Sequence, residues 1–495
     1  MKFGEFIDRC IEPFAPMAAL RRHQQRQALG MARQFDAAGH SRRTRGWKRT
    51  GGSANTEIGT GLARLRNGSS ELMRNNKYAA TFKRKLVAWI VGDGITVQLS
   101  HSDADFAKKA QAELDAHFKR RLDGINDFYG QQKLGVGAMI ERGDSILVWS
   151  SRDREINARC QVFEGDLIDH LKNDDQLAAG GRIIQGKEFD RFGDPVALWL
   201  FDQHPGDHGY AGKSKRYDIK DIDHLHEQLR PGQARGIPWL SPIMLDQKDM
   251  GELEGAIQMK KKIEACLALI LRPGAANPIP NPFDGVLEKN DKPNAPPIDT
   301  VRPGMIYRAQ PGDEATTLNP SSTGDGVDFI KQQIAAQATG FMPYFMMSGD
   351  MSQSSYISLR AAINDFYKLL DDWQQNICVV QMIAPAADRA LQLFYLKTGD
   401  KRYLQLGKSY GMPRRPALDP ISDVQGEREE IRSGFRTLTR SLAERGMTRE
   451  QYIEERVQEL QSLDDNGVIL DSDPRRVTNA GMLQQPVGYI RPQGK

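Results

Sequence analysis

The sequence predicts an α+β fold in which unusually long helices accompany a small antiparallel sheet. Apolar residues recur at helical spacing for about 40 residues, from the candidate N-cap Ser355 to Gly399. A second helical pattern of about 30 residues covers 241–271 and has Pro242 at its first position. Between about 135 and 228 the pattern changes to short strands separated by turns. The long helices suggest a strut within a large structure rather than a small enzyme domain.

The composition limits the class of protein. At 495 residues the chain is long enough for about two to four domains. Its 68 basic and 64 acidic residues nearly balance, which argues against a surface that grips nucleic acid everywhere. The four cysteines include no CxxC pair, so neither a disulfide framework nor a zinc ribbon is predicted. No apolar run approaches the roughly 20 residues of a membrane span, and we expect a soluble protein with no membrane contact.

The first 240 residues divide into a basic arm and a mixed domain. Residues 1–52 hold eleven Lys or Arg against four Asp or Glu, and they form either an arm on nucleic acid or an acidic neighbour, or a solvated tail. Residues 53–240 are predicted to begin with helices and to continue as an antiparallel sheet. The expected strands are Ser145–Trp149, Cys160–Phe163, Arg182–Gln185, Pro195–Phe201 and Ile222–Leu225.

The middle of the chain alternates helices with a proline-rich excursion. After the helix within 241–272, ten of the chain's 25 prolines fall in 273–326, which predicts an extended module with short strand-like pieces. A helix within 327–342 returns the chain to a loop over 343–355. The longest helix then lies within 356–410.

The C-terminal part is predicted to be helical over 411–470 and to end as a loose tail over 471–495. Four arginines at four-residue spacing would form one stripe on a helix face, provided that the helix continues through Gly434. These arginines are Arg428, Arg432, Arg436 and Arg440.

One pattern resembles a nucleotide-binding loop without completing it. Gly181, Gly186 and Lys187 have P-loop spacing, but Glu188 stands where a magnesium ion needs a Ser or Thr hydroxyl. The residues that follow are typical of a hairpin, so no helix N-terminus would face a phosphate. Nucleotide binding is therefore not predicted.

Five of the nine histidines are concentrated between 170 and 226, which makes a metal-dependent hydrolase an alternative function. They are His170, His204, His208, His224 and His226, with Asp207 nearby. His224 and His226 would share one face of a strand, yet two ligands are too few to define a metal site. Ordinary hydrogen-bonded histidines are the simpler interpretation. We assign no catalytic residue, cofactor or metal.

Four separated motifs carry a resemblance to a known family. They are Arg74-Asn75-Asn76-Lys77-Tyr78-Ala79, Val91-Gly92-Asp93-Gly94-Ile95, Arg230-Pro231-Gly232-Gln233-Ala234-Arg235-Gly236-Ile237-Pro238-Trp239, and the tract from Pro343 to Arg360 that includes Ser348-Gly349-Asp350. In these motifs and their order, the chain resembles the lambda-type family of phage portal proteins. It departs from the family at Ile357, where serine is usual, and over Leu418–Ser422, which only partly resembles the family's D-P-x-K-E.

The resemblance implies a portal-type fold that assembles as a cyclic ring, typically of twelve subunits. Its parts would be a wing (53–240 with 356–410), a helical stem (241–272 and 327–342), a small β-containing clip (273–326), a tunnel loop (343–355) and a helical crown (411–470). Double-stranded DNA would enter through the ring during packaging and leave through it during ejection. The implied partners are the terminase large subunit, a head-completion or tail-adaptor protein, and the major capsid and scaffold proteins. The implied location is the portal vertex of the virion, after synthesis in the host bacterial cytoplasm.

The resemblance also makes some residues candidates for facing the channel. Three consecutive lysines span about 200° of a helix, so at least one points away from the apolar stripe, towards either the channel or a neighbouring subunit. A loop of Met, small residues and one acid would bind DNA weakly and let it slide. The candidates are Lys260, Lys261, Lys262, Lys331, Met346, Met347, Ser348, Asp350, Met351 and Gln353. Candidates for terminase or adaptor docking are Asp284, Glu288, Lys289 and Lys292.

A further alternative is a DNA-binding protein that uses the basic arm of residues 1–52. It predicts an affinity for DNA that falls steeply with salt and disappears when the arm is removed. This alternative does not explain the order of helix, excursion, helix and loop.

Overall fold

The computed structural model describes residues 50–152, 155–177, 180–208, 212–266, 325–352, 355–416, 419–445 and 449–468, with a few short pieces elsewhere. The chain divides into two compact units, Met1–Thr56 and Glu57–Lys495, and the elements below belong to the second apart from the first turn of α3. Most of the predicted arm and clip, and the tail, lie outside the described residues. So do the candidates Asp284, Glu288, Lys289, Lys292 and Gln353.

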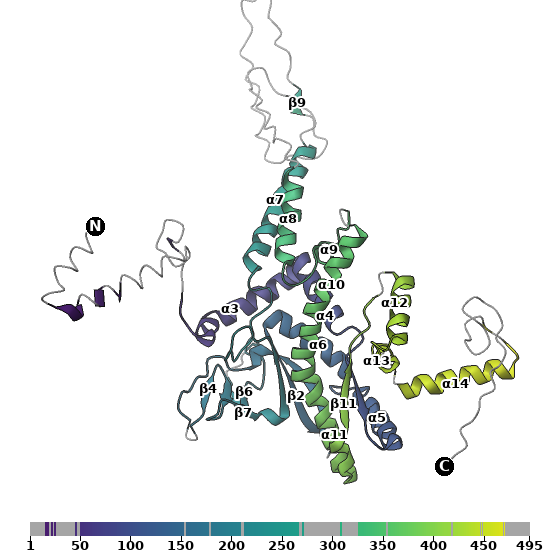
Figure 1. The fold of residues 1–495 in the computed structure, drawn as a ribbon. Coiled ribbons are helices and arrows are strands. Elements are labelled where there is room, and N and C mark those ends of the chain that lie inside the picture. Colours follow the sequence, from purple (N-terminus) through teal and green to yellow (C-terminus); the bar gives the residue numbers. More distant parts are fainter. Residues whose placement is uncertain are drawn as a thin grey trace, which may run out of the picture. The chain divides into compact units, whose positions relative to one another are not determined.

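Four helices within residues 54–142 precede the two larger sheets (Figure 1), and the last of them continues past residue 135, where the sequence predicted strands to begin. They are α3 (Ala54–Asn75), α4 (Lys77–Ile90), α5 (Ala104–Phe118) and α6 (Phe128–Arg142). Asn76 separates α3 from α4, because its side-chain oxygen accepts hydrogen bonds from the backbone N–H groups of Tyr78 and Ala79 at 2.9 and 3.2 Å. One face of α4 is buried at Phe82 and Leu86 in the main hydrophobic core.

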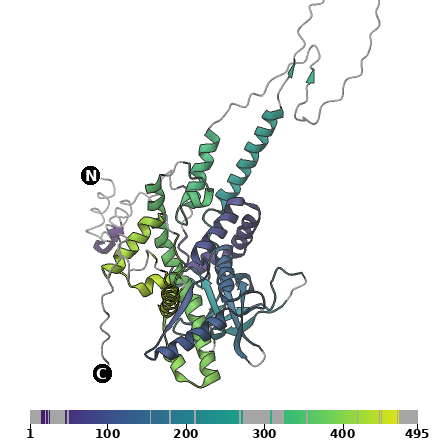
Figure 2. The same cartoon turned by 90° about the vertical axis from the view of Figure 1, so that its right-hand side faces the viewer.

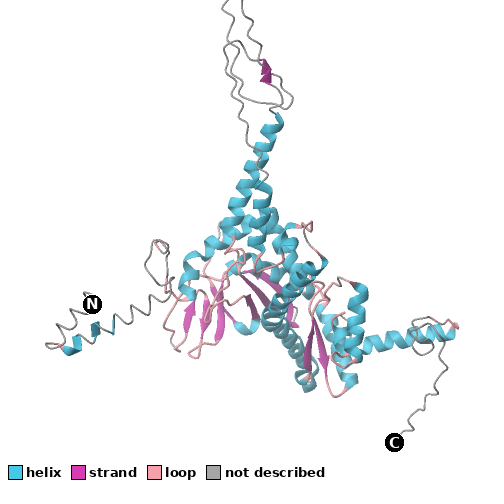
Figure 3. Cartoon of the chain, turned by 45° about the horizontal axis from the view of Figure 1, so that its top comes forward, coloured by secondary structure: helices cyan, strands magenta, loops and turns pink. Residues whose placement is uncertain are grey.

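The strands described between residues 96 and 226, with one partner at 407–411, form two antiparallel sheets and one antiparallel pair rather than a single sheet (Figure 3). The first sheet has the order β3-β2-β8, from Glu155–Glu164, Asp144–Arg152 and Ile222–His226. The second has the order β4-β5-β6-β7, from Arg182–Ile184, Lys187–Phe189, Pro195–Leu200 and Lys215–Asp218. The five predicted strands are present with shifted ends, whereas β5 and β7 were not predicted because they are short and polar. The pair joins β1 (Thr96–Ser100) to the distant β11 (Gly407–Gly411).

The predicted long helix is present from Tyr356 to Thr398, and both of its ends are capped as expected. The Ser355 hydroxyl accepts a hydrogen bond from the Ser358 N–H at 3.2 Å, and Gly399 ends the helix in the left-handed conformation. Its middle differs from the expectation, because Trp373–Ile383 is a π-helix between α10 (Tyr356–Asp372) and α11 (Ala384–Thr398). Pro385 cannot donate a hydrogen bond to the preceding turn, and the wider π-turn accommodates its ring.

The same helix corrects one expectation from the sequence. Tyr356–Thr398 contains an 18-residue window that satisfies the length and composition of a membrane span. However, 67% of that window is buried within the chain. In this structure it is a core helix that packs against β8. The Gln381 side chain accepts from the His226 N–H at 2.9 Å and donates to the His226 carbonyl at 3.1 Å.

Two helices lie side by side beyond the core, α7 (Met244–Cys266) and α8 (Asp325–Ala338) (Figures 1 and 2). A buried hydrogen bond of 2.8 Å joins the side chains of Gln247 and Gln337. The predicted start of α7 at Ser241 and Pro242 is wrong, because the helix begins at Met244 and the Ser241 hydroxyl donates instead to the Pro238 carbonyl at 2.6 Å. Just before the proline-rich segment, β9 (Ile270–Leu271) pairs in parallel with β10 (Tyr307–Arg308), which lies within that segment.

The C-terminal part is helical, with α12 (Pro420–Arg432), α13 (Leu438–Ala443) and α14 (Arg449–Asp465). The helix does not continue through Gly434, whose φ of 79° follows the end of α12. The four arginines therefore do not form one stripe, which corrects the prediction. Arg428 and Arg432 lie on α12, Arg436 lies in the connection, and Arg440 lies on α13.

Candidate functional site

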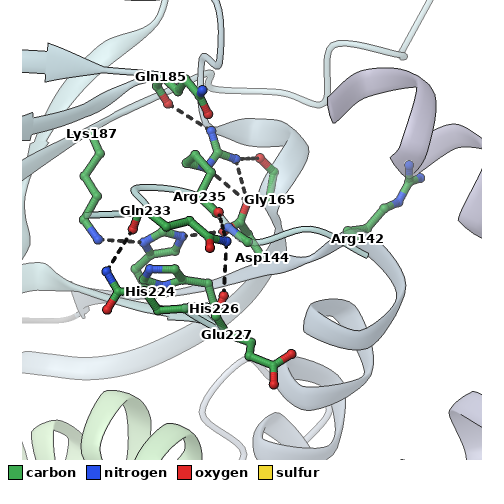
Figure 4. Close-up of polar contacts among 12 residues, drawn as sticks. Arg142, Asp144, Gly165, Gln185, Lys187, His224, His226, Glu227, Gln233 and Arg235 are labelled. Carbon is green, nitrogen blue, oxygen red and sulfur yellow. Dashed lines mark hydrogen bonds and ion pairs between the residues drawn. The ribbon is translucent and has the colours of Figure 1, made fainter. Parts of the chain in front are cut away.

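A fully buried carboxylate, Asp144, lies where four parts of the fold meet (Figure 4). One oxygen accepts hydrogen bonds from Arg66 of α3 at 2.5 Å and from Arg235 at 3.0 Å. The other faces His224 Nε2 of β8 at 3.0 Å and accepts from the Gly236 N–H at 2.7 Å. We call these five residues the Asp144 centre, and it links α3, strands β2 and β8 of the first sheet, and the segment that leads into α7.

The protonation states in the Asp144 centre follow from its burial and its charges. Burial alone would raise the pKa of the Asp144 carboxyl, but Arg235, His224 and Arg66 together hold that pKa well below its usual range. Burial lowers the pKa of Arg235 to about 10, which leaves it charged at neutral pH. Burial and the neighbouring His226 and Lys187 lower the pKa of His224 well below its usual value. The centre is therefore a carboxylate between two guanidinium groups with a neutral imidazole.

The motif from Arg230 to Trp239 now has a structural explanation. Arg235 extends the Asp144 centre by donating to the carbonyls of Gln185 at 3.0 Å and Gly165 at 2.8 Å. The side chain of Gln233 holds the segment in shape by donating to the Arg235 carbonyl at 2.7 Å. A Cβ at residue 236 would lie 2.0 Å from the carbonyl oxygen of Gly143, so only glycine fits there.

The same motif ends in an aromatic contact that fixes the start of α7. Trp239 packs on Trp373 of the long helix with 4.8 Å between ring centroids. Its backbone N–H donates to the Ile140 carbonyl of α6 at 3.1 Å. The Asn76 motif completes the anchoring, since Asn76 donates to the Gln247 carbonyl at 3.2 Å and Tyr78 donates to Glu254 at 2.8 Å. These contacts set the direction in which α7 leaves the core.

The histidines do not form one metal site. Candidate ligand atoms of Asp144, His224 and His226 do lie within 4.8 Å of one another, and the two imidazoles stack on one face of β8 as predicted. However, both Asp144 oxygens already face donors, and the Lys187 ammonium lies 3.4 Å from His224 Nδ1. A metal cation would meet three positive side chains here, so the residues do not fit a metal ion.

A second group joins His204 to Glu164 and Asp166. The guanidinium of Arg142 lies 3.3 Å from the Glu164 carboxylate and 3.6 Å from that of Asp166. His170 has a lowered pKa because it is half-buried and faces Arg235 and Arg66. Neither the His224–His226 group nor the His204 group offers carboxylates that are available to bind a metal ion. Arginine side chains already contact Asp144 in the first group and Glu164 and Asp166 in the second.

The P-loop spacing lies in the β4–β5 hairpin, and the hairpin that the sequence predicted is the next one, between β5 and β6. The chain turns between β4 and β5 at Gln185 and Gly186, which have φ values of 49° and 81°. Lys187 opens β5 and is buried, where desolvation lowers its pKa to about 8. No helix follows within this described stretch, so the backbone presents no phosphate cradle.

The predicted tunnel loop contains a short helix, α9 (Tyr344–Ser348), and a charged contact. Met346 and Met347 are 6% and 2% exposed and belong to the hydrophobic core, so they do not offer the flexible surface that was expected. Met351 is 59% exposed. Asp350 accepts from the Ser352 N–H at 2.9 Å and faces Lys331 of α8 at 3.2 Å. Hydrogen bonds from the side chain and backbone of Ser352, and then the contact with Lys331, lower the pKa of Asp350.

The remaining charged candidates lie on helices. Lys260 of α7 is half-buried, whereas Lys261 and Lys262 are exposed, as expected for three consecutive lysines. The four C-terminal arginines pair with nearby acids rather than presenting a free basic surface. Glu429 contacts Arg428 at 3.3 Å and Arg432 at 3.4 Å, and Glu444 contacts Arg436 and Arg440.

These features define the class of the protein. The Asp144 centre is buried, and both carboxylate oxygens face donors. The motifs around Asn76 and from Arg230 to Trp239 fix the orientation of α7, and the P-loop spacing lies in a β-hairpin. In the part of the chain that the structure describes, this is a mixed helix-and-sheet protein whose motifs position a long helix.

Comparison with known proteins identifies the family. The family model for phage portal proteins, lambda family, matches residues 40–374. The chain is 24% identical over 445 residues to the "Probable portal protein" of Halomonas phage phiHAP-1, a match that covers 84% of this chain and 83% of the relative. Because the family model spans more than half of its length, the chain belongs to the lambda family of phage portal proteins. It is a capsid portal protein of the virion, and the family is structural rather than enzymatic.

Solved structures with some similarity come from gene transfer agent particles. The neck of a native particle computed with C12 symmetry is 15% identical, with a TM-score of 0.39, and the match covers 75% of this chain and 91% of that chain. A chain of the native virion is 14% identical with a TM-score of 0.38, and the match covers 84% of this chain and 98% of that one.

The family assignment confirms the function that the motifs predicted. It does not favour a metal-dependent hydrolase or a DNA-binding protein that acts through its N-terminal arm. The match ends at residue 374, so the C-terminal helices lie beyond it.

Proposed function

We propose that twelve copies of this chain close into a ring whose channel carries double-stranded DNA into the capsid and out again. Membership of the portal family supports this proposal. One observation carries the assembly: the paired helices α7 and α8 expose large apolar side chains that a single copy leaves uncovered. They are Leu245, Leu253, Met259, Val327 and Phe329, with exposed fractions of 76%, 36%, 59%, 62% and 48%. Burying such surface between neighbours would contribute about 25 cal/mol per Å².

In this ring, α7 and α8 are the stem and line the channel. Lys331, Asp350 and Met351 would lie nearest the DNA, with Lys260–Lys262 further along the stem. The Lys331–Asp350 pair neutralises its own charge, so the loop would not hold phosphates tightly. DNA must slide through a portal, and a continuous basic wall would oppose sliding because each released counterion favours binding.

The other segments would meet the partners. Residues 53–240 with 356–410 would form the wing against the major capsid protein and the scaffold, and 411–470 the crown inside the head. The clip, 273–326, would bind the terminase large subunit during packaging and a head-completion or tail-adaptor protein afterwards. Asp284, Glu288, Lys289 and Lys292 are the docking candidates within it.

Replacement of 273–326 by a short Gly-Ser linker tests the role of the clip. We expect the variant to remain associated but to lose co-purification with the terminase large subunit. Unchanged binding of terminase would contradict the assignment of 273–326 as the docking segment. A matched variant that lacks only 471–495 should bind terminase as the wild type does.

A further inference from the structure

A groove of about 750 Å³ runs beside α4 and carries basic side chains without ion-pair partners among the described residues. Arg74, Arg84 and Lys133 line it and are exposed. Lys83 also lines it, but Glu141 already pairs with that lysine. The groove therefore presents three basic groups available to an acidic partner.

The groove also has an apolar component. Met73, Val87 and Leu134 line it, and Leu134 is 50% exposed. The lining holds four basic residues (Arg74, Lys83, Arg84 and Lys133) and two acidic ones (Asp93 and Glu141), a difference of +2. Helix α4 itself has four basic residues and no acidic one. A partner that combines apolar side chains with negative charge matches this surface.

Helix α14 has the complementary character. Its 17 residues include six acidic and two basic side chains, a net charge of −4. Ile453 and Val457 are each 45% exposed and lie one turn apart on one face, with Leu460 following at helical spacing. None of its residues with a described burial is buried. A helix of this length is marginally stable in water unless its apolar face is covered.

We propose that α14 of one copy docks in the α4 groove of the neighbouring copy. At 1.5 Å per residue the two helices are about 25 and 21 Å long, so they match in length. The stripe of Ile453 and Val457 would cover Val87 and Leu134. Glu450 and Asp464 lie within about 60° of that stripe and would face the basic rim. Because groove and helix are different surfaces of the same chain, the contact is heterologous and suits a cyclic ring. The inference rests on the proposed ring and names a contact within it.

Charge reversal on both sides tests this contact in the full-length protein. We expect Arg84→Glu with Lys133→Glu, or Glu450→Lys with Asp464→Lys, to raise the concentration for half-assembly at least about tenfold, because like charges would then face each other. Combining all four substitutions should restore assembly, as measured by native mass spectrometry over a concentration series. Glu450 is in the first turn of α14 and Asp464 is in the last. Reversing the first charge disfavours the helix dipole and reversing the second favours it, so the two effects on helix stability oppose each other.

A matched control reverses two acids on the opposite face of α14. Glu455→Lys with Glu459→Lys makes the same change in charge and should leave assembly unchanged. Intact rings in either reversed pair, or a fourfold variant that does not regain assembly, would overturn the contact while leaving the ring in place. Normal rings with weakened DNA retention in the groove variant would assign the groove to nucleic acid and also overturn it. A wild-type protein that forms no ring would instead refute the proposed assembly itself.

Discussion

Replacing Arg235 tests whether the Asp144 centre holds the fold together. Arg235 is fully buried and donates to Asp144, to the Gln185 carbonyl and to the Gly165 carbonyl at 2.8–3.0 Å. Arg235→Ala would leave the buried carboxylate with one guanidinium and would remove the donor of the Gln185 carbonyl. Removing one partner of a buried ion pair costs about 3–5 kcal/mol, because the other charge remains desolvated.

Urea unfolding followed by tryptophan fluorescence measures this cost, since Trp149 and Trp239 are buried in the same core. Arg235→Lys keeps the charge but not the planar fork, and should lose about 1–3 kcal/mol. Arg432→Ala is the matched control, because that arginine pairs with Glu429 on the surface, where the two side chains are 61% and 60% exposed, and should change stability by less than about 1 kcal/mol. A loss below about 1 kcal/mol for Arg235→Ala would refute the reasoning.

Three further predictions follow from individual contacts. Burial lowers the pKa of His226 to about 4, so its contribution to the free energy of unfolding is complete above pH 6.5 and is lost as the pH falls towards 4. The expected loss is on the order of 3 kcal/mol. Urea titrations at several pH values should show a smaller acid-induced loss of stability in His226→Gln than in the wild type. Gly236→Ala places a Cβ 2.0 Å from a backbone oxygen and should destabilise the protein by about 1–3 kcal/mol. Gly255→Ala lies in open space on α7 and should stabilise it by up to about 1 kcal/mol. Thermal unfolding measures both variants, and equal shifts in Tm would contradict the packing argument. Lys331→Asp should lower the yield of packaged DNA without preventing assembly, and adding Asp350→Lys should restore that yield. If the second substitution did not relieve the packaging defect, the ion pair between residues 331 and 350 would not be the cause of it.

Local signals explain what could be predicted from the sequence. The ends of the long helix depend on Ser355 and Gly399, which act on neighbouring backbone groups, and both were identified correctly. The hairpin turn between Phe189 and Pro195 and the shared face of His224 and His226 likewise follow from short-range rules. The family motifs marked the segment before α7, although the sequence did not reveal why it is constrained.

Long-range packing explains what could not be predicted. Arg66 reads as an ordinary helix residue, and only the folded chain brings it to Asp144, 78 positions away. Met346 and Met347 have the composition of a flexible loop, yet α9 turns them into the core. The two methionines show that residue type in a motif does not establish exposure.

The mass of the purified full-length protein tests the central claim most directly. Native mass spectrometry should show a closed assembly of about twelve 55.5 kDa chains, and end-on electron micrographs of the same sample should show a central channel. A chain that stays monomeric or dimeric at every concentration, also in the presence of its scaffold and capsid proteins, would contradict a ring-forming portal.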